Sequence, residues 1–196
     1  AVSAVTIKSR DTNSEYGTKI DIREGAILST SSVGMNLGTI VEVVGLFNSI
    51  PVRRKFLKNS KVEFEKILEV FFGYALSYPE ISFVLYRNGK LIHNLRKDTF
   101  ENRTVAVLGR NTYKYLIPLS YTGTHLSISG YVSNPQGALN SGLNQYLFVN
   151  NRFVNLKDVS KTIKKSYGTL LPHDAYPQFI LFLSLNPDLL DVNVHP

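Results

Sequence analysis

The stretch that most constrains the fold is 38–58, GTIVEVVGLFNSIPVRRKFLK. Residues 40–44 are β-branched except for Glu42, and such a nearly continuous apolar run predicts a strand buried on both faces. Pro51 fixes its own φ and disfavours the α region at Ile50, so a corner follows the strand. Three consecutive cationic residues follow this corner in the sequence: Arg53, Arg54 and Lys55.

The segments before this stretch predict an antiparallel pair of strands. Residues 2–10 and 18–23 alternate between apolar and polar side chains, and the polar residues 11–17 form the turn between them. Residues 25–37 are rich in serine and glycine and have no period, and an ordinary surface loop is one interpretation of this segment.

A helix is predicted at residues 59–77. Ser60 and Glu63 have the spacing of a capping box, and Pro79 lies just past the last turn. We expect this helix to pack on strand 40–44 and Phe71 to be buried, because one broad face is apolar. That face carries Phe64, Ile67, Leu68, Phe71, Phe72 and Ala75.

The chain then predicts a hairpin and a domain boundary. Asn88-Gly89, the strongest short hairpin signal, joins the strand-like segments 81–86 and 90–95. Between Arg96 and Arg103 the chain turns polar and charged, so we place the boundary there. The two predicted domains are 1–100 and 101–196.

The order of the expected strands and helices in the second domain predicts an α+β layer. A short helix at 105–108 ends at Gly109, residues 133–142 form a loop, and Asn155 caps a longer helix whose apolar face holds Leu156, Val159, Ile163 and Tyr167. The predicted strands are 116–121, 126–132, 144–150 and 179–185. A strand–helix–strand return places the helix on one face of a sheet.

Composition and motifs exclude several kinds of site. There is no cysteine, and the four histidines do not have metal-ligand spacing, so we expect no metal site. No phosphate-binding loop with its lysine and no nucleophile elbow is present. We therefore expect no catalytic residue in this chain. No apolar run approaches the roughly 20 residues of a membrane span, so no membrane partner is expected.

The net charge of +7 favours an anionic partner. The cations form two clusters in the sequence: Arg53, Arg54, Lys55, Lys58 and Lys61, and then Arg152, Lys157, Lys161, Lys164 and Lys165. They are either two solvated faces or a groove for a phosphate backbone, since scattered lysines and arginines bind duplex DNA without reading its sequence.

Three blocks resemble the MutL/PMS/MLH family of mismatch-repair proteins. The first is the Gly38–Lys58 stretch, which resembles GT-x-V-x-V-x-x-LF-x-x-x-P-x-R-x-K-F. The second, Gln145–Val154, is similar to the family's Q-x-x-x-V-N-x-R block, and the third, Asp191–Pro196, to its DVNVHP. The blocks occur in the family's order and span most of the chain.

The resemblance implies a fold and a set of roles. The fold is α+β: the C-terminal part of a GHKL ATPase sandwich, including the end of the segment that closes over ATP at 25–37, and then a transducer domain similar to ribosomal-protein domain 2. Gly38 and Thr39 would lie beside the nucleotide. Arg152, which leaves a strand at an Asn150-Asn151 turn, would lie in the DNA-binding groove. The other DNA-binding candidates are Arg53, Arg54, Lys55, Lys161, Lys164 and Lys165.

The same resemblance implies cofactors and partners. The intact protein would use ATP and Mg²⁺ as a weak ATPase, bind DNA non-specifically, dimerise through its N-terminal domains and contact a MutS-type protein. It would be intracellular, in the nucleus of a eukaryote or the cytoplasm of a prokaryote. The family's catalytic Glu, metal-holding Asn and D-x-G-x-G motif do not occur in this sequence. This segment alone is therefore expected to be inactive and to hold no cofactor.

Two other functions fit the residues without the resemblance. One is a stand-alone nucleic-acid-binding module, and the other is an interaction scaffold whose positive charge is incidental.

Overall fold

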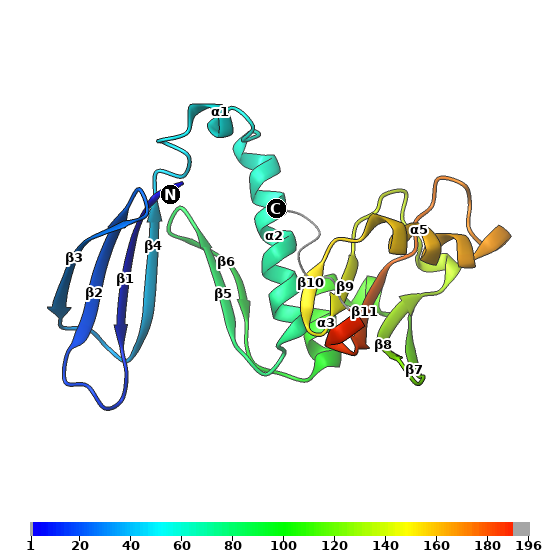
Figure 1. Cartoon of the computed structure of the whole chain (residues 1–196). Coiled ribbons are helices and arrows are strands. Elements are labelled where there is room, and N and C mark those ends of the chain that lie inside the picture. Colours follow the sequence, from blue (N-terminus) through cyan, green and yellow to red (C-terminus); the bar gives the residue numbers. More distant parts are fainter. Residues whose placement is uncertain (1, 190–196) are drawn as a thin grey trace. The chain divides into compact units, whose positions relative to one another are not determined.

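The computed structural model describes residues 2–189, which fall into two compact units divided between residues 65 and 66 (Figure 1). The boundary that we predicted at Arg96–Arg103 lies inside the second unit, and the assignment of domains 1–100 and 101–196 stays a prediction. The third family block, Asp191–Pro196, lies outside the described residues.

The first unit holds a four-stranded antiparallel sheet in the order β3-β2-β1-β4. Its strands are β1 (Ala4–Arg10), β2 (Gly17–Arg23), β3 (Ala26–Val33) and β4 (Gly38–Val44). The predicted pairing of the first two strands is confirmed. The interpretation of residues 25–37 as a surface loop is wrong, since most of them form β3. Glu24 and Gly25 both have positive φ and turn the chain tightly, and Ser29 then donates a hydrogen bond to Asp21 on β2.

The predicted burial of residues 40–44 is also wrong. Within the first unit β4 is an edge strand that pairs only with β1, and Val41 and Val44 are 59% and 68% exposed. Val41 and Val43 lie opposite the apolar Ile7 and Val5, whereas Glu42 on the other face forms an ion pair with Lys8 at 3.3 Å. The β-branched residues specify a strand, but the layers around it decide burial.

The predicted corner after β4 begins the short helix α1 (Pro51–Arg54), with Pro51 in its first turn. Ile50 is outside the α region, as predicted (φ −132°, ψ 78°). A proline suits this position because the first turn of a helix needs no backbone N–H donor.

Helix α2 (Ser60–Ser77) begins one residue after the predicted start and ends where predicted, but it does not have the predicted cap. The side chain of Asn59, not Ser60, accepts the N–H groups of Lys61 and Val62, while Glu63 accepts the N–H of Lys58. An asparagine one position earlier reaches the same free donors, so it replaces the serine.

The buried face of α2 differs in part from the prediction. Ala75 and Leu76 are fully buried, but Ile67 is 52% exposed and Phe71 is only half-buried. Phe71 makes ring contacts with Phe72, Phe83 and His93. Phe83 and His93 belong to the hairpin of β5 (Phe83–Arg87) and β6 (Lys90–Leu95), whose predicted Asn88-Gly89 turn is confirmed by two positive φ values. The predicted packing of α2 on β4 joins two units and stays a prediction.

The second unit contains a five-stranded sheet in the order β10-β9-β11-β8-β7. The strands are β7 (Leu116–Thr122), β8 (Leu126–Ser133), β9 (Gln145–Val149), β10 (Arg152–Val154) and β11 (Phe179–Leu185). Because β11 runs parallel to β9 and α5 (Lys157–Ser166) lies between them in sequence, the predicted strand–helix–strand return is confirmed. The sequence analysis missed β10.

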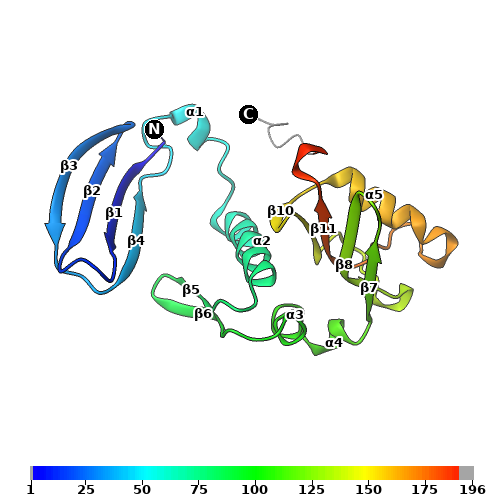
Figure 2. The ribbon, with the colours of Figure 1, turned by 60° about the horizontal axis from the view of Figure 1, so that its bottom comes forward.

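Helices lie on both sides of this sheet, α3 on one and α5 on the other (Figure 2). A hydrophobic cluster packs between the helices and the sheet on each side. On one face, Leu76 of α2 packs with Tyr146, Phe148 and Ile180, together with residues of α3 (Phe100–Leu108). On the other, Leu147, Phe179 and Leu181 pack against Val159 and Ile163 of α5. The alternation along β9 sends successive side chains to opposite faces.

The shorter elements complete the second unit. Helix α3 begins at Phe100, earlier than predicted, because Thr99 accepts the Asn102 N–H; it ends as predicted at Gly109, whose φ is 82°. Asn155 does not cap α5: the N-cap is Leu156, without a side-chain hydrogen bond, and Leu156 is 45% exposed. The remaining elements are α4 (Arg110–Tyr113), η1 (Pro135–Gly137), η2 (Gly168–Leu170) and η3 (Pro187–Leu189).

Arg103 joins the helices to the hairpin within the second unit. Its side chain is 1% exposed, and its guanidinium donates hydrogen bonds to four backbone oxygens at 2.7–3.0 Å. These oxygens belong to Ala75, Pro79, Ile81 and Arg96. The polar segment that we interpreted as a boundary is therefore packed around a buried cation.

Candidate nucleic-acid interface

Arg152 is held at the end of a two-residue hairpin turn between β9 and β10. Asn150 and Asn151 have φ of 48° and 63°, the left-handed conformation that such turns require and that asparagine tolerates better than most residues. Arg152 pairs directly with Val149 and its side chain is exposed. The turn therefore fixes the backbone of Arg152 and leaves its guanidinium open to solvent.

The turn is anchored on two sides. The Asn150 amide donates to the Leu185 carbonyl at 3.0 Å and accepts the Leu185 N–H at 2.9 Å. Ser77, the last residue of α2, donates to the Asn151 carbonyl at 3.0 Å. Our sequence analysis identified the turn but none of these anchors, and the Asn150-Asn151 pair was the only signal for them.

The α5 lysines differ in what they contact. Lys161 forms an exposed ion pair with Asp158 at 3.0 Å, and Lys165 is exposed. Lys164 donates to the His173 carbonyl at 2.7 Å and lies 3.9 Å from the centre of the Tyr176 ring. The ammonium group of Lys164 is thus already engaged with the loop after α5, which makes it a weaker phosphate ligand than Lys165.

The first cation cluster belongs to the first unit. Arg53 and Arg54 form the last turn of α1, Lys55 is its C-cap residue, and all three are exposed. Because Arg152 and the α5 lysines belong to the other unit, a single groove shared by both clusters stays a prediction.

Gly38 and Thr39 begin β4. Gly38 has φ of 122°, which L side chains rarely adopt, although a Cβ atom there would meet nothing within 4 Å among the described residues. Glycine is therefore required by the backbone conformation rather than by crowding. The Thr39 hydroxyl lies 2.8 Å from that of Ser9.

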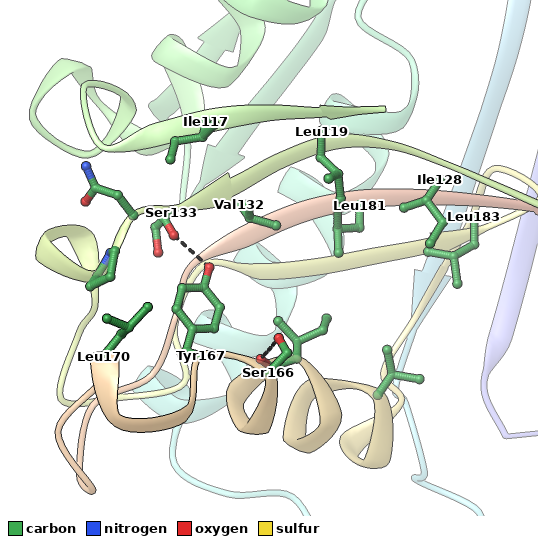
Figure 3. Close-up of a pocket in the computed structure, with 14 residues that line it drawn as sticks. Ile117, Leu119, Ile128, Val132, Ser133, Ser166, Tyr167, Leu170, Leu181 and Leu183 are labelled. Atoms are coloured by element: carbon green, nitrogen blue, oxygen red, sulfur yellow. Dashed lines mark hydrogen bonds between the residues drawn. The ribbon is translucent and has the colours of Figure 1, made fainter. Parts of the chain in front are cut away.

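An apolar pocket of about 490 Å³ lies between α5 and the sheet (Figure 3). Its polar edge is a 2.6 Å hydrogen bond from the Tyr167 hydroxyl to the Ser133 carbonyl. Burial raises the pKa of Tyr167, and this hydrogen bond offsets part of the rise. The lining includes Ile117, Leu119, Val132, Leu181, Ile163 and Leu170. Nothing in this lining forms a nucleophile–base pair.

Other kinds of site receive no support from the described residues. Residues 2–189 contain no group of three or more His, Asp or Glu side chains that could hold a metal ion. None of the helices in that range has the length and apolarity that a membrane crossing requires. The cationic turn at Arg152 is therefore the strongest candidate for a functional site.

Comparison with known sequences identifies the family. Residues 104–196 match the family described as "DNA mismatch repair protein, C-terminal domain". The DNA mismatch repair protein MutL of Porphyromonas gingivalis is 35% identical over all 196 residues. The match covers 32% of that protein, so the chain spans about a third of the length of the curated relatives.

Solved structures agree with the sequences. The MutL ATPase domain of Aquifex aeolicus, complexed with ADP, is 31% identical with a TM-score of 0.73, and the match covers 95% of this chain and 69% of that domain. The N-terminal domain of a DNA repair protein gives a TM-score of 0.80 at 26% identity, over 100% of this chain and 64% of that one. The α+β fold is therefore that of the GHKL-type MutL ATPase domain, and this chain belongs to the MutL family of DNA mismatch-repair proteins.

Proposed function

We propose that this chain is the part of a mismatch-repair ATPase that connects nucleotide binding to DNA binding. In the intact protein, ATP binding closes the segment that precedes Gly38 over the nucleotide and dimerises the N-terminal halves. The closed dimer holds DNA and a MutS-type partner differently from the open form. The observation that carries this proposal is the exposed guanidinium of Arg152 on an anchored turn, in a chain of net charge +7.

The DNA contact is to the backbone. A guanidinium on a fixed turn can donate two parallel hydrogen bonds to phosphate oxygens, which a mobile lysine does less well. Lys161 and Lys165 add weaker contacts from α5, and Arg53, Arg54 and Lys55 add contacts from the first unit. No sequence preference is expected, since phosphates are the same at every base pair.

The test is a salt titration of DNA affinity on two unrelated duplexes, with the wild type and Arg152→Glu. We expect the substitution to weaken binding to both duplexes and to flatten the salt dependence by about 0.9 in log–log slope for each lost phosphate contact. Arg110→Glu is the matched control, because Arg110 is also exposed but lies on α4. Equal affinity and slope for wild type and Arg152→Glu would remove Arg152 from the interface. A strong preference for one duplex would mean that the chain reads bases, and it would contradict contact to the phosphate backbone alone.

The nucleotide role belongs to the longer protein. Gly38 and Thr39 would lie beside ATP, with Mg²⁺ held by residues that this sequence does not contain. Because a nucleotide without its metal and adenine contacts gains little binding energy, the 196-residue chain by itself should not turn over ATP. Magnesium-dependent hydrolysis that co-purifies with the chain through several columns and persists at constant specific activity would contradict this.

A further inference from the structure

We propose that Asn150 and Ser77 are positioning residues for DNA binding: they hold the β9–β10 turn so that the Arg152 guanidinium keeps one presentation toward phosphate. This inference rests on the proposed DNA contact of Arg152 and adds the residues through which the fold controls that contact.

The strand that carries Arg152 is weakly held by its own ladder. β10 has three residues, lies at the edge of the five-stranded sheet and pairs only with β9. So short an edge strand can fray. Its position therefore depends on contacts outside the ladder.

Asn150 supplies the first of these contacts. The parallel β9–β11 ladder ends at the pair Val149–Leu183, and the Asn150 N–H then donates to the Leu183 carbonyl at 2.9 Å. One step further, the Asn150 side-chain amide bonds both the N–H and the carbonyl of Leu185. The Asn150 side chain thus extends the β9–β11 ladder as one more peptide unit would. It joins the turn to β11, the central strand of the sheet.

Helix α2 supplies the second contact. The Ser77 hydroxyl donates to the Asn151 carbonyl, within the turn itself. One turn earlier, Gly73 lies against the Phe153 ring so closely that a Cβ atom there would be 2.9 Å from it. The residues on both sides of Arg152 are therefore fixed by the last two turns of α2, while Arg152 itself stays exposed.

The test compares the DNA affinity of two variants of the full 196-residue chain. Each variant is made once with Arg152 present and once in an Arg152→Ala background. Asn150→Gly keeps the positive φ but deletes the amide, and Ser77→Ala deletes only the hydroxyl. With Arg152 present, each should weaken binding about three- to tenfold, the scale of one impaired charge-assisted hydrogen bond. In the Arg152→Ala background, neither should change the affinity by more than about twofold, because the positioned group is gone.

A matched control separates positioning from general loosening. Asn144 also has positive φ (59°), and its amide donates to Gln178 at 2.6 Å, away from the turn. Asn144→Gly should leave DNA affinity unchanged in both backgrounds. Hydrogen exchange of the Leu185 amide gives a readout without DNA, and exchange should accelerate in Asn150→Gly but not in Asn144→Gly.

Three outcomes would overturn the inference. If Asn150→Gly and Ser77→Ala bind DNA as the wild type does while Arg152→Ala binds weakly, positioning is refuted and the proposed function stands. If they weaken binding equally in both backgrounds, they act on another contact or on the fold. If Arg152→Ala itself has no effect, the proposed DNA role and this inference fail together. Should Asn150→Gly not fold, the Ser77→Ala pair decides alone.

Discussion

Replacing the buried Arg103 by methionine should destabilise the second unit more than replacing any of its exposed arginines by an apolar residue. Methionine has a similar length and stays apolar, so the substitution removes the guanidinium without leaving a large void. It deletes hydrogen bonds to the oxygens of Ala75, Pro79, Ile81 and Arg96, and a cation–π contact 5.7 Å from the Phe83 ring.

The structure sets the size of the effect. Hydrogen bonds from a charged group are worth about 1.5–3 kcal/mol each, but four of them do not simply add. Only the hydrogen bond to the Ala75 oxygen is fully buried. Without the guanidinium, the other three oxygens can accept hydrogen bonds from water. Burial also lowers the pKa of Arg103, which marks the cost of desolvating the cation, and Asp98 and Glu80 offset part of it. We expect a loss of about 3–5 kcal/mol, which combines one buried carbonyl left without a donor and three charge-assisted hydrogen bonds whose oxygens return to water.

The assay is urea unfolding followed by far-ultraviolet circular dichroism, fitted with a common m-value. Arg110→Met is the matched control, because its side chain is exposed on α4; it should change the free energy of unfolding by less than about 0.5 kcal/mol. Arg103→Lys should fall between wild type and Arg103→Met, since one ammonium cannot reach four oxygens. A loss below about 1 kcal/mol in Arg103→Met would refute the idea that this guanidinium joins α2, the β5–β6 hairpin and α3.

Two further predictions concern the rest of the chain. Phe71→Ala should cost about 2–3 kcal/mol in the same assay, less than a fully buried phenylalanine, because the ring is half-buried but contacts Phe83 and His93; a loss above about 4 kcal/mol would mean that the ring is fully enclosed. The Lys19 ammonium, with the hydroxyls of Thr6 and Ser29, lowers the pKa of Asp21 from 3.8 to about 2. A depressed pKa in the folded state gives stability that is complete above about pH 4 and is lost as the pH falls toward 2. The urea midpoint of the wild type should therefore drop more between pH 5 and pH 2.5 than that of Asp21→Asn, and equal drops would contradict the assignment.

Local conformational preferences were enough to predict many elements. The Asn88-Gly89 turn, the end of α3 at Gly109 and strand 179–185 were all predicted from a few neighbouring residues. The same holds for the tight turn at Asn150-Asn151. Such features depend on φ preferences and on side-chain alternation, which act within a few residues and do not need the rest of the chain.

Burial and the anchoring of the candidate site were decided only by tertiary structure. The apolar run 40–44 forms a strand, yet its burial depends on which layers cover it, and no local pattern specifies those layers. Arg103 looked like part of a polar boundary because the four oxygens around it come from residues 75–96 and meet only in the fold. Asn150 meets Leu185, 35 residues away, and Asn151 meets Ser77, 74 residues away. The sequence by itself determined the family, most of the helices and strands, and the turn that carries Arg152. The tertiary structure alone decided what holds that turn in place, because hydrogen bonds between distant segments form only after the packing of α2 and β11 has brought their partners together.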